Sequence, residues 1–202
     1  MEETQLFWYA LKVFYNKVFD FEDLLQGMGY ETYFPVELVR LTGEDHLRAA
    51  RRLATPDSTR SQSRFVQAGP AIFRRKPVVN SLIFVHAPAE DIPKIRFEIE
   101  GRGFIYMTPD WKQPEVIPDR QMGMFRMVAS SGADGLQFFS DDDITRYRQG
   151  DRVRVTEGPL KGAEGYIKRI KKDRRLLVAI EGFVAVAVSF IPPQFLEKVT
   201  QS

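Results

Sequence analysis

The sequence contains no cysteine and only two histidines among its 202 residues. The lack of cysteine excludes disulfides and thiolate metal sites, and it fits the reducing cytoplasm, where we expect the protein to act. His46 and His86 are too few for a histidine-rich metal site or a catalytic centre. No apolar run approaches the ~18–20 residues of a membrane helix. The acidic start, Glu2-Glu3, is also unlike the basic start of a secretory signal.

The motifs of common enzyme classes are missing too. There is no phosphate loop of the Gly-x-x-x-x-Gly-Lys-Ser/Thr type, no His-Glu-x-x-His and no Gly-x-Ser-x-Gly. Asp141, Asp142 and Asp143 are consecutive, so they cannot all face one ion on a regular element, and a hard-cation loop needs spaced ligands. We therefore expect no enzymatic activity, no metal and no cofactor.

Hydrophobic residues make up 44% of the chain, enough for a packed core. The net charge is only +2, but it is unevenly distributed. Residues 40–76 carry nine basic and three acidic side chains, whereas residues 1–39 carry two basic and seven acidic ones. A basic segment in a chain of low net charge indicates a local anionic partner.

The first 130 residues alternate between strand and helix patterns. The aromatic and β-branched run from Phe7 to Tyr15 is typical of a strand covered on both faces. The expected elements are a strand at 7–15, a helix at 18–28, strands at 31–38 and 78–87, a helix at 89–99, a strand at 104–107 and a helix from Pro118. This order predicts an α+β fold, a ferredoxin-like split βαβ domain with an extra helix, at residues 5–130.

Residues 40–76 interrupt this pattern and lose periodicity. We interpret them as a long basic insertion with a short helical turn at 47–53. Arg74, Arg75 and Lys76 adjoin an ordered strand and are the best candidates for binding nucleic-acid phosphates. The alternative is a solvated loop without a partner.

The C-terminal quarter contains only strand patterns. Between 150 and 170 two alternating runs surround a turn with Gly158, Gly162 and Gly165, where the chain can bend or approach another backbone closely. Runs at 175–180 and 184–188 flank Glu181-Gly182, a hairpin turn. We expect a small SH3-like β-barrel at 148–200, joined to the first domain by a polar linker at 131–147.

The glycine-rich stretch at 150–170 resembles the KOW motif. Together with Trp8-Tyr9 on the first strand, the strand Ser81–Val85 and the helix beginning Ile117-Pro118-Asp119, it makes nearly the whole chain similar to NusG-type transcription elongation factors. Within that family the stretch Ile117–Met122 is most similar to the UpxY-type antiterminators of capsular polysaccharide loci. The resemblance implies an NGN-like N-terminal domain followed by a KOW domain.

The resemblance also implies a partner. An apolar face of the N-terminal domain of these factors binds the clamp helices of RNA polymerase, and the complex resists pausing and termination. Trp8, Val79, Leu82 and Phe84 are the matching candidates here, although the ordinary alternative is that they are core residues. Housekeeping members carry aromatic-Pro-Gly-aromatic where this chain has Val79-Asn80-Ser81-Leu82.

The barrel departs from the housekeeping members as well. They place an aromatic residue before the hairpin glycine, where it binds ribosomal protein S10 or Rho, whereas this chain has Glu181 before Gly182 and Phe183 after it. We therefore expect an antiterminator of specific long operons that also contacts upstream or non-template DNA or nascent RNA. The alternatives are a general elongation factor coupled to the ribosome or Rho, and an RNA-binding KOW module that needs no polymerase.

Overall fold

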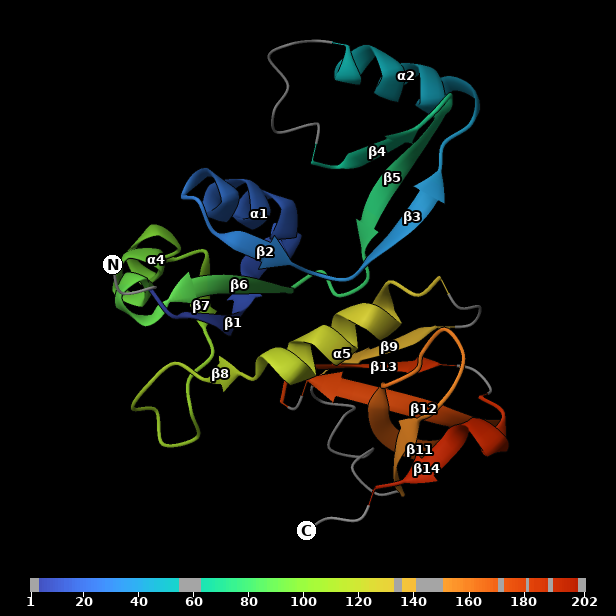
Figure 1. Ribbon diagram of the computed structural model, residues 1–202. Helices are drawn as coiled ribbons and strands as arrows, with labels where there is room; N and C mark the ends of the chain where they lie inside the picture. The colour runs from blue at the N-terminus through green and yellow to red at the C-terminus, as the bar shows by residue number, and fades with distance from the viewer. Residues whose placement is uncertain are drawn as a thin grey trace. The chain divides into compact units, whose positions relative to one another are not determined.

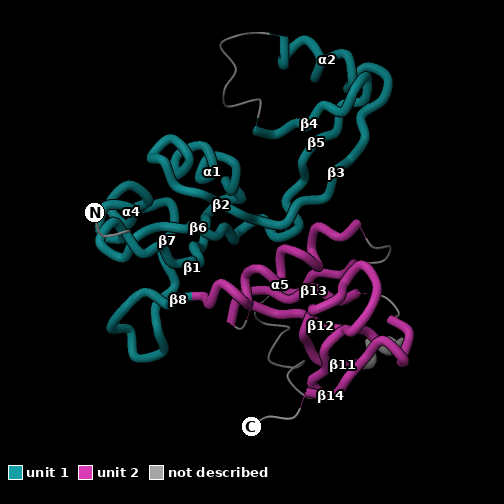
Figure 2. The backbone as a smooth tube through the Cα atoms, in the orientation of Figure 1, with its two compact units in different colours: residues 1–116 teal, residues 117–202 magenta. Residues whose placement is uncertain are grey.

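The chain folds into two compact units, residues 1–116 and 117–202 (Figure 2). The computed structural model describes residues 4–54, 63–132, 136–140, 151–170, 173–180, 182–188 and 191–199. Within these ranges no helix combines the length and the apolar character needed to cross a membrane.

The first unit is built on an antiparallel sheet with the strand order β2-β6-β1-β7 (Figure 1). Its elements are β1 (Leu6–Val13), η1 (Phe14–Asn16), α1 (Val18–Gly27), β2 (Glu31–Tyr33), β6 (Leu82–Pro88), η2 (Ala89–Asp91), α4 (Ile92–Glu98), β7 (Gly103–Ile105) and β8 (Val116–Ile117). β6 lies between the two strands that α1 connects, and β1 lies between the two strands that α4 connects. This arrangement is the split βαβ fold that the sequence predicts.

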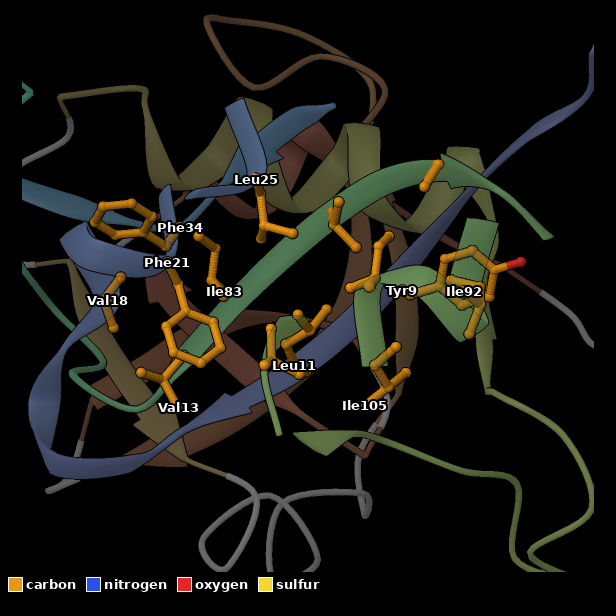
Figure 3. Packing of buried hydrophobic residues seen from close by; sticks show 14 residues of the cluster. Tyr9, Leu11, Val13, Val18, Phe21, Leu25, Phe34, Ile83, Ile92 and Ile105 are labelled. Carbon is orange, nitrogen blue, oxygen red and sulfur yellow. The ribbon is translucent and has the colours of Figure 1, made fainter. Parts of the chain in front are cut away.

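The core of this unit lies on one face of the sheet. Alternate residues of β1, such as Tyr9 and Leu11, point to that face together with Ile83 of β6 (Figure 3). Phe21 of α1 and Ile95 of α4 pack against them, and all five are at most 2% exposed. Both helices therefore cover the same face, which leaves the even-numbered side chains of β1 on the other.

The basic insertion is folded, which corrects the loop expected at residues 40–76. It contains β3 (Val36–Arg40), α2 (Gly43–Leu53), β4 (Phe65–Ala68) and β5 (Ala71–Pro77), with the strand order β3-β5-β4. Its core is small, since Leu41, Ala49 and Ile72 are its buried residues. Only one side chain of β5 is fully buried, so the alternation was hidden among arginines and a strand was not recognised.

The second unit contains a six-stranded antiparallel sheet with the order β14-β10-β11-β12-β13-β9. Its elements are α5 (Asp119–Ala129), β9 (Gln137–Ser140), β10 (Arg152–Val155), β11 (Glu164–Ile170), β12 (Asp173–Ile180), β13 (Val184–Val188), η4 (Pro193–Phe195) and β14 (Leu196–Lys198). The expected hairpin is present, with Ile180 opposite Val184. From β10 to β14 the described regular elements are strands, as the sequence predicts, except for the short 3-10 helix η4 before β14.

Two elements, α5 and β9, do not follow the domain limits expected from the sequence. α5, assigned by its sequence to the first domain, packs on the sheet of the second unit, where Gln121 Nε2 donates to the carbonyl of Ala179 at 3.3 Å. The ring of Phe125 meets that of Phe138 edge-on at 6.5 Å. Phe138 belongs to β9, which lies within the segment expected to be a linker. This segment forms a strand because its two aromatic residues, Phe138 and Phe139, can cover both the helix and the sheet.

Candidate functional site

The strand register brings three of the four predicted polymerase-binding residues to one face. Trp8 lies opposite His86, Ala10 opposite Phe84 and Lys12 opposite Leu82, and directly paired residues of antiparallel strands project to the same side. We call this the second sheet face, because α1 and α4 cover the other. Val79 precedes β6 and is half-buried, so it lies outside the strand register.

Aromatic rings are concentrated on the second sheet face. Trp8 stacks on His86 with centroids 4.6 Å apart, and Tyr33 of β2 stacks on Phe84 at 6.5 Å. Nδ1 of His86 lies 3.4 Å from a carboxylate oxygen of Glu31. Trp8, Leu82 and Phe84 are only 4%, 3% and 0% exposed.

The accessible part of the same face is an aromatic edge that the sequence did not reveal. Phe104 of β7 lies opposite Lys12, so it projects to the second sheet face. Phe14 lies in η1, directly after β1. Phe14 contacts Phe104 and Tyr15 edge-on at 6.0 and 6.3 Å, and Phe104 contacts Tyr106 at 5.3 Å. Phe14, Phe104 and Tyr15 are 37%, 43% and 83% exposed. We call Phe14, Tyr15, Phe104 and Tyr106 the aromatic edge.

One residue of the aromatic edge has an unusual backbone conformation. Tyr15 has a φ of 57°, in the left-handed region that bulky residues rarely adopt. Such backbone costs on the order of 1–3 kcal/mol and clusters at functional positions. The only signal in the sequence was an aromatic pair, Phe14-Tyr15, continuing past the point where the strand ends.

The three predicted phosphate-binding residues have different surroundings in the structure. Arg75 donates two hydrogen bonds to the carboxylate of Glu22, at 2.8 and 2.9 Å, and its guanidinium also lies over the rings of Phe34 and Phe19. It therefore ties the insertion to α1. Arg74 is exposed, and exposed Lys76 lies 3.5 Å from Glu37. These two are the members of the predicted set that project to the surface.

A hollow of about 390 Å³ lies beside Arg74 in the insertion. Ten residues line it: Phe19, Leu41, Asp45, Arg48, Ala49, Arg52, Arg64, Phe65, Arg74 and Arg75. Half of them are arginines, contributed by α2, by the residue before β4 and by β5. We call it the arginine hollow. The sequence showed the arginines but not that the fold gathers five of them.

The predicted KOW glycines occupy the positions that need glycine. Gly158 and Gly162 have φ values of 83° and 90°. At Gly165 a Cβ would lie 2.2 Å from the carbonyl oxygen of Leu177 on β12, so only glycine permits this strand pairing. Phe183, a predicted partner-binding residue, is buried, and Gly182 before it has a φ of 85°. Glu181 and the aspartates at 141–143 lie outside the described residues.

In the second unit a buried carboxylate, that of Glu164, binds three arginines beside the glycine-rich turn. Glu164 follows the glycine-rich turn, and Arg120, Arg152 and Arg154 all donate to it, with the Arg154 bonds at 2.7 and 2.8 Å. Burial raises the pKa of Glu164, but the hydrogen bond from Arg154 and the three positive charges outweigh it and hold the pKa below its usual value. The cluster therefore fixes α5, which carries Arg120, on the sheet.

No protein-family model and no curated protein matches the sequence. Among solved structures, the chain is similar to one described as "Domain interaction in Thermotoga maritima NusG". The TM-score is 0.43 and the sequence identity 15%, and the match covers 97% of this chain and 98% of that one.

Proposed function

We propose that this protein is a transcription elongation and antitermination factor that binds RNA polymerase through the second sheet face. The observation that carries the proposal is the aromatic edge, which offers exposed rings beside the buried Trp8 and Phe84. Tyrosine and tryptophan are the residue types that most often dominate interface energies. The polymerase clamp helices are the partner implied by the resemblance to NusG-type factors, and an apolar helical surface can pack on such rings.

The basic insertion supplies a second contact in this proposal. A factor bound to polymerase lies close to upstream DNA, the non-template strand and nascent RNA. Between Val36 and Pro77 the chain carries nine basic and four acidic side chains, and Arg74 and Lys76 are exposed on β5. Contacts of these cations with phosphates add affinity that does not depend on base sequence.

The C-terminal unit favours an operon-specific factor over a general one. An aromatic side chain displayed at the β12–β13 hairpin is what the housekeeping contact with ribosomal protein S10 or Rho requires. Phe183 is instead only 5% exposed in this chain, where it contributes to the core. We therefore propose processive transcription of long operons, such as UpxY-type polysaccharide loci, and no coupling to the ribosome or Rho through this ring.

Site-specific photo-crosslinking of the full-length chain tests the polymerase contact. A photoreactive phenylalanine analogue replaces Tyr15 or Phe104, and the control replaces Phe97. Phe97 is 76% exposed on α4, which packs on the opposite face of the sheet, and it lines one hollow with Phe104, so it is a close control for the face itself. We expect crosslinks from positions 15 and 104 to the largest polymerase subunit, and none from position 97.

Function is tested with the variants Tyr15→Asp and Phe104→Asp. Loss of a hot-spot ring costs on the order of 2 kcal/mol, so polymerase retention and terminator read-through should fall by roughly tenfold or more. Phe97→Asp should leave both unchanged. Equal crosslinking from all three positions contradicts the proposed face, and binding to RNA alone without polymerase favours the RNA-binding alternative.

A further inference from the structure

The segment from Tyr106 to Glu115, between β7 and β8, forms a short arm with a tryptophan at its tip. At its base the backbone N–H of Glu115 donates to the carbonyl of Tyr106 at 3.0 Å. Nearer the tip, the N–H of Thr108 donates to the carbonyl of Gln113 at 2.8 Å. Trp111 lies between these paired segments and is 75% exposed. We call this segment the tryptophan arm, and Figure 1 shows that it extends away from the sheet of the first unit.

A second set of hydrogen bonds fixes the tip of the arm. The hydroxyl of Thr108 donates to Oδ1 of Asp110 at 2.6 Å and accepts from the N–H of Gln113 at 3.4 Å. The N–H of Lys112 also donates to Asp110, at 3.4 Å. The hydrogen bond from Thr108, followed by that from Lys112, holds the pKa of Asp110 below its usual value, so this carboxylate accepts both bonds at neutral pH. The N–H of Trp111 donates to the carbonyl of Thr108 at 2.8 Å, so the tip is ordered before any partner binds.

The backbone conformation of Trp111 is unfavourable for a tryptophan. Its φ of 58° lies in the left-handed region, which bulky residues rarely adopt and which glycine adopts without steric cost. The ring also contributes little to the core, because it is mostly exposed. Single exposed apolar side chains are common on protein surfaces, but strained residues are concentrated at functional positions. A binding role therefore explains a tryptophan at this position better than fold stability does.

We infer that Trp111 inserts into an apolar pocket of RNA polymerase and is a second anchor of the complex, beside the aromatic edge. The inference rests on the proposed function and extends its contact along the tryptophan arm. Tryptophan is among the residue types that most often dominate interface energies. Because the arm is already ordered, binding costs it little conformational entropy. The arm begins at Tyr106, a member of the aromatic edge, so one partner can contact both.

The charge of the arm favours a protein pocket over a nucleic-acid base. Stacking of bases on exposed aromatic rings is normally combined with a positively charged groove that follows the phosphates. The arm carries two acidic side chains, Asp110 and Glu115, and one basic side chain, Lys112, which lies 3.5 Å from Asp110. Its net charge is therefore negative. Since charged groups across an interface are usually complementary, we expect the rim of the polymerase pocket to be basic.

The test measures the affinity of variants of the full-length chain for purified RNA polymerase by biolayer interferometry. Trp111→Ala removes the ring, and Trp111→Gly removes the ring and also suits the left-handed backbone. The matched control is Phe97→Ala, because Phe97 is a ring of nearly equal exposure, 76%, on α4. Thermal unfolding followed by circular dichroism gives the stability of each variant.

Both Trp111 variants should bind polymerase roughly tenfold more weakly than the wild type, and Phe97→Ala should bind equally well. The loss should be similar at low and high salt, because the contact is mainly apolar. Trp111→Gly should unfold at nearly the wild-type temperature, since its positive φ offsets the greater freedom of glycine in the unfolded chain. Undiminished binding by Trp111→Gly would overturn the inference. A lower unfolding temperature together with weaker binding would assign the ring to the fold and would overturn it as well.

Thr108 is the positioning residue of the arm. Thr108→Val keeps the shape of the side chain but removes the hydroxyl that holds Asp110 and Gln113. It should weaken polymerase binding by about threefold, because the ring must then be ordered on binding. In the Trp111→Gly background the same change should have no further effect, since no ring is left to position. An equal loss in both backgrounds would mean that the arm binds without the ring, and it would overturn the inference.

The outcomes separate this inference from the proposed function. Crosslinks from positions 15 and 104 to polymerase, with undiminished binding by Trp111→Gly, would leave the proposed function standing and exclude Trp111 as an anchor. Weaker binding of Trp111→Ala to a labelled single-stranded DNA, with polymerase binding unchanged, would assign the ring to base stacking and overturn the protein pocket. If the wild-type chain does not bind polymerase, both the proposed function and this inference are wrong.

Discussion

Each unit of the molecule buries one carboxylate, and the two are neutralised in different ways. Glu22 in the first unit and Glu164 in the second are the buried charged residues of the described chain. Glu22 depends on Arg75, which is itself mostly buried. Glu164 is surrounded by three arginines whose side chains are 38–66% exposed. The Glu22 site is thus a single ion pair between residues distant in the sequence, whereas the Glu164 site has three arginines for one carboxylate.

This difference decides what each ion pair contributes. A buried ion pair roughly balances its own desolvation, but removing one partner leaves an uncompensated charge in a dry environment. Within the part of the chain that the structure describes, Arg75 is the one ion-pair partner of Glu22, so removing Arg75 removes the neutralising charge in a single step. Glu164 can lose one arginine and still face two others. The comparison therefore predicts a steep response in the first unit and a graded one in the second.

The largest effect is expected for Arg75→Met. This change should destabilise the first unit by about 3 kcal/mol, because it strands the buried Glu22 carboxylate. Urea unfolding followed by tryptophan fluorescence measures it, since both tryptophans, Trp8 and Trp111, belong to the first unit. Arg74→Met, one residue away and exposed, should change stability by less than about 0.5 kcal/mol.

A companion variant separates a stranded charge from lost packing. Glu22→Leu/Arg75→Met removes both charges, so it should recover at least half of the stability that Arg75→Met loses. No recovery in the double variant would mean that the methylene stem of Arg75 and its contacts with Phe19 and Phe34 carry the effect.

A smaller and pH-dependent effect is expected for Glu164→Gln. The pKa of Glu164 lies below its usual value in the folded state, so the ionised group stabilises the fold above the pKa of about 4.3 of an unfolded glutamate. This contribution is lost as the pH falls through the folded pKa. At neutral pH the substitution should cost about 2 kcal/mol, the value of charge-assisted hydrogen bonds.

The measurement is the urea midpoint from circular dichroism at pH values from 7 to 3. The difference between wild type and Glu164→Gln should shrink toward zero at the acidic end. The tryptophan signal of the first unit should give the same midpoint in both proteins. A difference that stays constant with pH would show that Glu164 acts through shape and not through its charge.

The sequence predicted the elements whose periodicity was strong and missed those built on charged residues. β1, α1, β6 and α4 follow the apolar patterns of a covered sheet and its helices, so their order and core were predictable. The sequence favours a loop in the insertion because adjacent arginines, Arg51-Arg52 in α2 and Arg74-Arg75 in β5, obscure the apolar periodicity. Only Ile72 and Ala49 indicate which side of β5 and which side of α2 face the core, and that core is small.

The residue types of the candidate site could be predicted from the sequence, but their burial and their partners in the fold could not. Trp8, Leu82 and Phe84 share a face as a strand pattern implies, but their burial and the exposure of Phe104 depend on the tertiary fold. The Arg75–Glu22 pair joins residues 53 positions apart, a separation that no local pattern encodes. Arg75 was therefore predicted to bind phosphate when its charge is already neutralised.

The smallest effect is expected for a single arginine of the second cluster. Arg154→Gln should cost less than about 1 kcal/mol, because the side chain is 47% exposed and Arg120 and Arg152 still face Glu164. Adding Arg152→Gln and then Arg120→Gln should cost more at each step, because the last removal leaves Glu164 as isolated as Glu22 is in Arg75→Met. Hydrogen exchange of the β10–β11 amides measures the series. Equal steps would mean that the three arginines act independently, and the contrast between a single tie and a shared cluster would then be lost.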